Sequence, residues 1–268
     1  MRYIDWNIKA GNKAEEFYEY LNSKMEKESC IVTLQEVKPN CARTIREKFG
    51  SNYNIVYSID YRPVGEFDSG NRELGVMIIT SKDIEIESQG VFDRTILPER
   101  TLYANLKIAN KKYRIVTFHA VTGSGFLYGK AVQYRSMAEC IKEFKPDFVS
   151  MDANEPKVDA LDIEEMEFFS QGPGDEGDKN GARIFFRELI KLGLDDSYKK
   201  VKTGNTNTQP LKVSHVIKDA KGNAKRECRY DFIFLTDCVK VQTVDYLYDE
   251  STRPGLSDHA MVVANVEM

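Results

Sequence analysis

The chain has 268 residues, of which 41% are hydrophobic and 30% charged, and a formal net charge of −4. A chain of this length and composition can bury a full core, which excludes an intrinsically disordered protein. It contains no apolar run near the roughly 20 residues that span a bilayer, which excludes a helical membrane protein.

Strand-like and helix-like segments alternate along the chain, without a repeat or an obvious linker. β-Branched and aromatic runs predict strands at 3–8, 31–37, 55–59, 75–80, 102–108, 113–118, 148–151, 230–235 and 261–266. Apolar residues at helical spacing predict helices at 13–27, 41–49, 127–144 and 183–192. This mixture predicts one α/β domain over residues 1–268, in which two mixed β-sheets pack together with helices outside.

The first residues alternate like a strand and lack the charged-then-apolar profile of a secretion signal. A native start at Met1 would therefore predict a cytoplasmic protein, with secretion after removal of a signal as the alternative. The five cysteines form no CxxC pair, which is typical of a reducing compartment. Because the chain has only three histidines, we expect any metal to be held mainly by oxygen, which favours Mg²⁺, with Mn²⁺ as a substitute.

Charge is distributed unevenly along the chain. Residues 159–180 contain eight acidic side chains and one basic one, whereas residues 199–229 contain nine basic and two acidic ones. An asymmetry of this kind can steer a polyanion to one face of a protein. Two solvated segments of opposite charge are the plainer interpretation, and charge alone favours it.

Eight polar side chains stand where predicted strands begin or end. They are Asn7, Glu36, His119, Asp152, Asn154, Asp231, Asp258 and His259. Each one alone is explained by a turn, a cap or a core histidine with satisfied hydrogen bonds. Because an unpaired buried polar group costs roughly 1–3 kcal/mol, we interpret the whole set as a single pocket.

These residue types suit hydrolysis of a phosphate ester. Glu36, with Asn7 and Asp258, offers oxygen ligands for Mg²⁺, which neutralises the charge that develops on a phosphoryl oxygen. Asp152 and Asn154 are two residues apart on an extended segment, so their side chains point the same way. Asp152 can orient a water while Asn154 donates a hydrogen bond to the phosphate.

Asp258 and His259 lie where a polar loop enters an apolar strand, which holds both side chains at the rim of a sheet. His259 can move a proton near neutral pH if a carboxylate orients its second ring nitrogen. We take Asp231, at the start of another strand, as the candidate for that carboxylate.

Five short motifs occur in an order that resembles the endonuclease/exonuclease/phosphatase superfamily. The motifs are Trp6-Asn-Ile, Leu34-Gln-Glu-Val, Met151-Asp-Ala-Asn-Glu-Pro, Tyr230-Asp-Phe-Ile and Leu256-Ser-Asp-His. Each is weak alone, but the ordered set spans residues 6 to 259. Met151 departs from the family pattern, which usually has glycine before Asp-x-Asn. The resemblance implies a four-layer α/β sandwich and Mg²⁺-dependent cleavage of phosphodiesters or phosphomonoesters.

His119 resembles the histidine of the deoxyribonuclease-I-like and sphingomyelinase-like members, where exonuclease-III-like members carry a tyrosine. The deoxyribonuclease pairs this histidine with a glutamate, which implies a catalytic pair of Glu73 with His119. Arg100 likewise implies a contact with the scissile phosphate, and a surface role is the alternative for both Glu73 and Arg100. With the Asp231–His259 pair, the site would supply a base on one side of the phosphorus and an acid on the other, in either order.

Lys9 and Lys38 match positions where the deoxyribonuclease has arginines that contact DNA. Lysine keeps the charge of arginine but loses its bidentate fork. The resemblance therefore implies nucleic acid, DNA rather than RNA, as the substrate. Contacts of this kind reach the phosphate backbone and carry little base information.

The leading hypothesis is a Mg²⁺-dependent DNA endonuclease with little sequence specificity. The alternative enzyme is a phosphomonoesterase or a small-molecule or lipid phosphodiesterase, acting on a nucleotide, an inositol phosphate or a sphingomyelin-like head group. The acidic net charge favours this alternative. A third hypothesis is a binding module that kept the scaffold, although a binder does not need both His–acid pairs.

Overall fold

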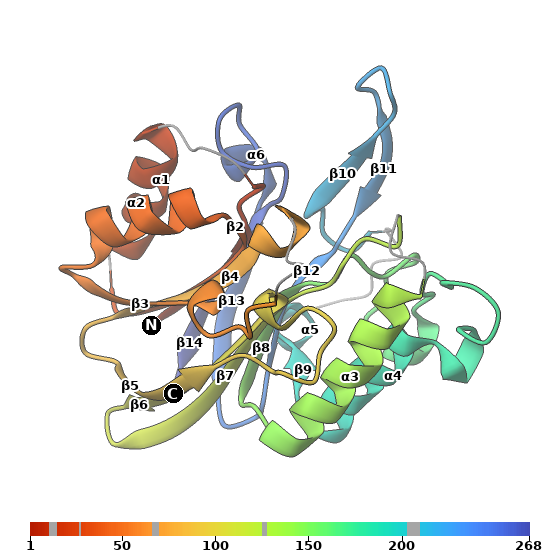
Figure 1. The fold of residues 1–268 in the computed structure, drawn as a ribbon, viewed down its shortest axis with the longest axis horizontal. Helices are drawn as coiled ribbons and strands as arrows, with labels where there is room; N and C mark the ends of the chain where they lie inside the picture. The colour runs from red at the N-terminus through yellow and green to blue at the C-terminus, as the bar shows by residue number, and fades with distance from the viewer. Residues whose placement is uncertain (11–14, 27, 66–69, 125–127, 203–209) are drawn as a thin grey trace.

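The structure is a computed structural model that describes residues 1–268 except 11–14, 27, 66–69, 125–127 and 203–209. Within that part of the chain, two six-stranded β-sheets pack face to face with helices on both outer surfaces (Figure 1). The first sheet contains, in spatial order, β13 (Lys240–Leu247), β14 (Met261–Glu267), β1 (Arg2–Asn7), β2 (Cys30–Val37), β4 (Gly75–Ser81) and β3 (Tyr53–Tyr57). The second contains β5 (Glu85–Gly90), β6 (Thr101–Ile108), β7 (Lys111–His119), β8 (Phe148–Asp152), β12 (Asp231–Leu235) and β9 (Asp195–Asp196).

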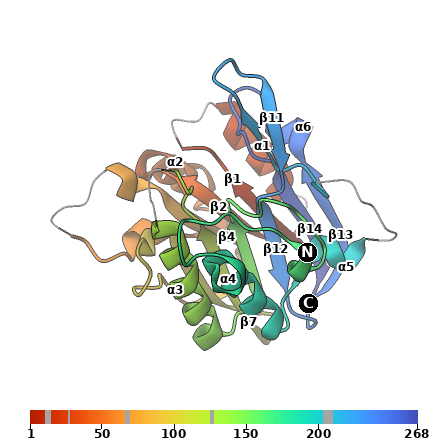
Figure 2. The ribbon, with the colours of Figure 1, turned by 90° about the vertical axis from the view of Figure 1, so that its right-hand side faces the viewer.

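Helices cover each sheet on the side away from the other sheet. Helices α1 (Glu15–Met25) and α2 (Pro39–Phe49) pack on the first sheet, and α3 (Gly129–Phe144) and α4 (Gly181–Lys191) pack on the second (Figures 1 and 2). Two short helices, α5 (Ser197–Val201) and α6 (Tyr248–Ser251), lie in connections between strands. None of the described helices combines the length and apolarity needed to cross a membrane.

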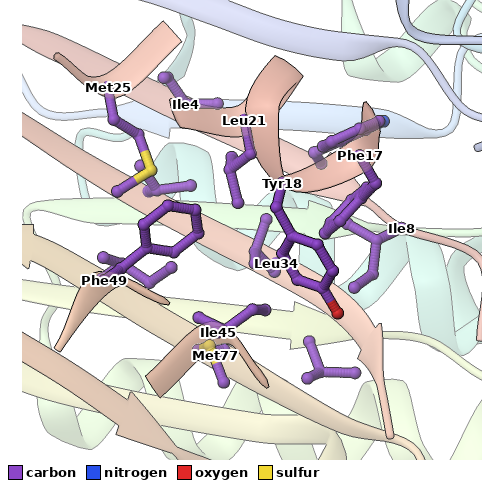
Figure 3. Close-up of a cluster of buried hydrophobic side chains, with 14 of the residues drawn as sticks. Ile4, Ile8, Phe17, Tyr18, Leu21, Met25, Leu34, Ile45, Phe49 and Met77 are labelled. Atoms are coloured by element: carbon purple, nitrogen blue, oxygen red, sulfur yellow. The ribbon is translucent and has the colours of Figure 1, made fainter. Parts of the chain in front are cut away.

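Apolar side chains fill three layers between these four layers of secondary structure. Strand alternation explains the layering, because successive residues of β1 point to opposite faces. Ile4 and Trp6 pack under helix α1, where Trp6 stacks on Phe17 with ring centroids 5.3 Å apart. Figure 3 shows this layer around Leu34. Tyr3 points the other way, into the layer between the sheets. The predicted four-layer sandwich is confirmed.

Each of the nine predicted strands corresponds to a strand of the two sheets, and the four predicted helices correspond to α1–α4. Residues 13, 14, 27 and 127 of the predicted helices lie outside the described residues. The third predicted strand ends too late, because residues 58–60 form a 3₁₀ turn.

The strands that sequence reasoning missed lie at the edges of the structure. Strand β5, the pair β10 (His215–Lys218) and β11 (Ala224–Cys228), and most of β13 bury few side chains, and β9 has two residues. An edge strand with polar side chains lacks the β-branched, alternating signature on which strand prediction depends. Strands β10 and β11 form a two-stranded hairpin that projects beyond the sandwich (Figures 1 and 2).

Candidate active site

The residues that face the opposite sheet become polar toward one end of each central strand. They are Tyr3, Asp5 and Asn7 on β1; Ile31, Thr33 and Gln35 on β2; Ile115, Thr117 and His119 on β7; and Phe148, Ser150 and Asp152 on β8. On β12, which runs antiparallel to β8, Asp231 pairs with Asp152. The apolar layer between the sheets therefore ends in a cluster of functional side chains.

Beneath this cluster, hydrogen bonds between buried side chains connect the two sheets. The Tyr3 hydroxyl donates to Ser150 Oγ over 3.0 Å, and Ser150 Oγ donates to Thr33 Oγ1 over 2.8 Å. Thr33 Oγ1 and Gln35 Nε2 both donate to one carboxyl oxygen of Asp5 over 2.6 Å. Burial raises the pKa of Asp5 to about 8, so this carboxyl adds no charge beneath the site at neutral pH.

His259 and Asp231 form a buried ion pair at the polar end. Nδ1 of His259 lies 2.9 and 3.2 Å from the two carboxylate oxygens of Asp231. Burial alone would lower the pKa of His259, but the carboxylates of Asp231 and Asp152 outweigh it and raise the pKa to about 10. His259 is therefore an imidazolium at neutral pH, with Nδ1 held by Asp231.

His119 has the opposite charge state. Burial, followed by the positive charge of Arg100, lowers the pKa of His119 to about 3, and the carboxylate of Glu36 opposes this shift only in part. Nη1 of Arg100 lies 3.0 Å from Nδ1 of the neutral ring, which accepts the hydrogen bond. The ring proton is then on Nε2, which lies 3.5 Å from Asp152 Oδ2 and 3.7 Å from Glu36 Oε1.

Glu36 is directed into the site by an irregular stretch of backbone. The pairing of β2 with β4 shifts register between Leu34 and Val37, which is a bulge of the kind that re-aims a side chain. Glu36 has a φ of 57°, and Lys9 and Asn154 have φ values of 50° and 49°. Positive φ is uncommon outside glycine and tends to occur at functional sites.

Asn7, Asp152 and Asn154 form a hydrogen-bonded cluster between the two histidines. Asn7 Nδ2 donates to one carboxylate oxygen of Asp152 over 2.8 Å, and the Asn154 backbone N–H donates to the other over 3.0 Å. Reactive atoms of Asp152, Asp231 and His259 lie within 4.8 Å of one another. Since Asp152 also neighbours His119, side chains from five strands converge on one neighbourhood.

The oxygen atoms of Glu36 and Asn7 suit a hard divalent cation. Glu36 is a quarter exposed, one of its oxygens accepts the Ala10 N–H over 3.0 Å, and the other faces His119. The amide oxygen of Asn7 accepts the Lys9 N–H over 2.9 Å, which turns it toward the same loop. Carboxylate and amide oxygens are the kind of ligand that Mg²⁺ prefers.

Asp258, the third predicted ligand, points to a different partner. Its carboxylate lies 3.2 Å from Lys9 Nζ, and both side chains are more than 40% exposed. Among the described residues, the groups of three or more His, Cys, Asp or Glu side chains close enough to share an ion are Asp152 with Asp231 and His259, and His215 with Asp258 and His259. Glu36 is in neither group, so a site formed jointly by Glu36, Asn7 and Asp258 stays a prediction.

The predicted pair of Glu73 with His119 is not formed. Glu73 is exposed at the end of a 3₁₀ turn (Gly70–Glu73), and this turn directs its neighbour Arg72 to the buried carboxylate of Glu99. Among the described residues, the carboxylates within ion-pair distance of His119 are those of Glu36 and Asp152. The partner of His119 is therefore Glu36 and not Glu73. This contact joins β2 of the first sheet to β7 of the second, so only the tertiary structure shows it.

The predicted phosphate-binding residues divide into two groups. Arg100 and Asn154 lie beside Asp152 and His119, and Arg100 is buried. Lys9 and Lys38 lie at the rim, where Lys38 is the residue before helix α2. The roles of the two lysines therefore stay predictions.

His215 is a site residue that sequence reasoning missed. Its ring stacks on His259 with centroids 4.3 Å apart, and its Nδ1 lies 3.0 Å from the carbonyl oxygen of Asp258. The available signal was that His215 is one of only three histidines in the chain. Strand β10, which carries it, has too few buried side chains to be recognised from its pattern.

Comparison with known proteins finds the fold in solved structures only. No protein-family model and no curated protein sequence matches the chain. An AP endonuclease from Archaeoglobus fulgidus is 17% identical, with full coverage of both chains and a TM-score of 0.67. TDP2 from D. rerio, complexed with a single-stranded DNA product, is 16% identical over 100% of this chain and 99% of that one, with a TM-score of 0.64. A mannosyl-6-phosphatase from Bacteroides thetaiotaomicron is 15% identical over the whole of both chains, with a TM-score of 0.65.

Proposed function

We propose that this chain, which has the fold of the endonuclease/exonuclease/phosphatase superfamily, is a metal-dependent phosphoesterase that hydrolyses phosphodiester bonds of DNA. The observation that carries the proposal is the convergence of side chains from five strands around Asp152. A cationic His259 and a neutral His119 stand on either side of the Asn7–Asp152–Asn154 cluster. A structural network has no need to gather so many buried ionisable groups, whereas phosphate hydrolysis uses both acceptors, such as Asp152, and cations, such as Arg100 and His259.

Each side chain of the cluster has a part in this reaction. Asp152 is the acceptor that orients the attacking water, because its carboxylate is held in place by Asn7 and Asn154. His259 and Arg100 direct positive charge at the phosphoryl oxygens, where negative charge grows in the transition state. His259 also has a proton on Nε2 that it can donate to the leaving oxygen. A divalent cation held by Glu36 and Asn7 would neutralise further charge on the phosphoryl group.

Two openings beside the site support a polymeric substrate. One, of about 560 Å³, is bordered by Asp258 and by the cations Lys9, Lys218 and Arg253. The other, of about 580 Å³, reaches Asn154 and has aromatic walls from Phe169 and Tyr230. A cationic groove suits a phosphate backbone, and aromatic faces suit a base. Similar structures include a DNA-bound TDP2 and an AP endonuclease, which is a further reason to choose DNA.

The test is nicking of supercoiled plasmid in Mg²⁺, with EDTA as the metal-free control. We expect nicking by the native protein, its loss in EDTA, and a loss of roughly 10²–10⁴-fold in His259→Ala. Glu36→Gln is expected to need more Mg²⁺, whereas Glu47→Gln, an exposed glutamate on helix α2, is the matched control. Intact plasmid under all of these conditions would refute the proposal.

A phosphomonoesterase is the second candidate. The net charge of −4 and the similarity to a mannosyl-6-phosphatase and to a 3′ phosphatase from Neisseria favour it. Release of inorganic phosphate from small monoesters, measured beside plasmid nicking, separates the two. Phosphate release with intact plasmid would replace the first proposal by the second.

A further inference from the structure

All three histidines of the chain lie at the site, and His215 has no part in the reaction proposed above. His215 begins β10, in the hairpin that projects beyond the sandwich (Figure 2). Strands β10 and β11 form a sheet of their own, which is attached to the rest of the molecule at its base and through Arg226 on β11, a donor to the carbonyls of Pro156 and Lys157.

The base of the hairpin is joined to both segments that carry the Asp231–His259 pair. The Ala260 N–H donates to the Ser214 carbonyl over 2.6 Å, and His215 forms a β-bridge with His259. Ser214 Oγ accepts the Asp231 N–H over 3.2 Å. His215 is therefore fixed where the two members of the ion pair meet.

The side chain of His215 contacts two aromatic rings and forms one hydrogen bond. Its ring stacks on His259 with centroids 4.3 Å apart and 25° between the ring planes, and the ring of Tyr230 lies 6.1 Å away at 21°. Nδ1 lies 3.0 Å from the Asp258 carbonyl oxygen, which can only accept, so this nitrogen carries a proton. The ring therefore has little freedom to move.

The hydrogen bond to Asp231 does not by itself fix the plane of the His259 ring. A hydrogen bond at Nδ1 fixes one edge of the imidazole, but the ring can still tilt about that bond. The face contact from His215 opposes this tilt. We propose that His215 is a positioning residue for the phosphoesterase reaction proposed above, and that its ring holds the plane of His259 so that Nε2 points at the scissile phosphate. Misdirection of Nε2 then lowers kcat and leaves KM nearly unchanged, because substrate contacts elsewhere remain.

Three substitutions separate the ring of His215 from its hydrogen bond. His215→Phe keeps a flat ring against His259, His215→Asn keeps an amide donor for the Asp258 carbonyl, and His215→Ala removes both. We expect kcat for plasmid nicking to fall roughly 10²-fold in the Asn and Ala variants, and by less than about fivefold in the Phe variant. Lys221→Ala, at the exposed turn of the same hairpin, is the matched control and is expected to retain native kcat.

Two results would overturn the inference. Native kcat in His215→Ala would show that the ring is dispensable, and rescue by Asn but not by Phe would assign the role to the hydrogen bond. Thermal unfolding of each variant shows whether it folds. If His215→Ala does not fold, the Phe and Asn variants still decide the matter, because each keeps one of the two contacts.

NMR of ¹⁵N-histidine-labelled protein tests the same inference without turnover. The Nδ1 proton of His259, bonded to Asp231, is expected to give a sharp signal in the native protein and in His215→Phe. It is expected to broaden in the Asn and Ala variants, where the ring is free to tilt. Equally sharp signals in all variants would overturn the inference. A native protein that cleaves no phosphate ester would refute only the proposed function, and the NMR comparison would still decide the role of His215.

Discussion

His119 and His259 are the same residue type at the same end of the two sheets, yet they differ in charge at neutral pH. Nδ1 of His259 lies 2.9 Å from a carboxylate oxygen of Asp231, and the pKa of His259 rises to about 10. Nδ1 of His119 lies 3.0 Å from Nη1 of Arg100, and the pKa of His119 falls to about 3. Burial favours the neutral form of both rings; the carboxylates beside His259 overturn that preference, whereas Arg100 beside His119 reinforces it.

This difference shows how one edge of a sandwich can hold two chemical environments a few ångströms apart. The His259 side has an excess of carboxylates, Asp231 and Asp152, and therefore keeps a cation. On the His119 side, burial keeps the ring neutral, and the buried guanidinium of Arg100 adds to this effect. Asp152 neighbours both sides, which places the candidate acceptor for water between a donor cation and a neutral ring.

The largest effect is expected when the His259 side loses its counter-charge. Asp231→Asn keeps the shape of the side chain and removes the carboxylate that holds His259 protonated. The pKa of His259 should fall, and kcat should drop roughly 10³-fold, which is within the range of acid–base contributions. A pH titration of His259 by NMR, with kcat from plasmid nicking, measures both. An unchanged His259 pKa would remove the basis of the comparison.

A smaller effect is expected on the His119 side. Arg100→Met keeps most of the volume and removes the positive charge beside Nδ1. The pKa of His119 should rise, because the guanidinium no longer opposes protonation, and kcat should fall roughly 10²-fold through loss of a phosphate contact. The same NMR titration follows His119. Arg94→Met, which removes an exposed arginine paired with Glu143, is the control and should change neither value.

The next largest effects are expected on stability. A substitution beside one histidine should also change the surroundings of that histidine more than those of the other. Gln133 accepts the Val121 N–H over 2.8 Å and donates to the His119 carbonyl over 3.2 Å. Gln133→Leu should lower the free energy of unfolding by about 1–3 kcal/mol, because it leaves two buried groups unpaired, and should shift NMR signals of His119 more than those of His259. Urea unfolding provides the measurement. Gln242→Leu, at the exposed edge strand β13, should stay within about 0.5 kcal/mol of native.

The smallest effect is expected at Glu73. Because this residue is exposed and does not pair with His119, Glu73→Gln should change kcat by less than about twofold, as exposed substitutions usually do. Plasmid nicking beside Glu36→Gln provides the comparison between the two glutamates. A loss in Glu73→Gln as large as that in His259→Ala would restore the pair that the resemblance implied.

Much of the fold could be predicted because the central strands are buried on both faces. Apolar runs predicted nine strands, of which the edge strand β3 is one, and Asn7, Glu36, Asp152 and Asp231 stood at strand ends where the pattern turned polar. Along β8, the side chains that face the other sheet change from apolar Phe148 to polar Ser150 and acidic Asp152. The sequence of this strand alone therefore shows the increase in polarity toward the site. Edge strands such as β13 were missed, because exposure leaves no such pattern.

The sequence by itself determined which side chains lie at the ends of strands, since strand alternation is a local property that each segment carries alone. Only the tertiary structure decided which of them meet. It placed Glu36 rather than Glu73 beside His119, brought Arg100 to the same ring, and set His215 against His259. These contacts join segments far apart in the chain, and the charge of each histidine depends on them, because electrostatic interactions act through space and not along the sequence.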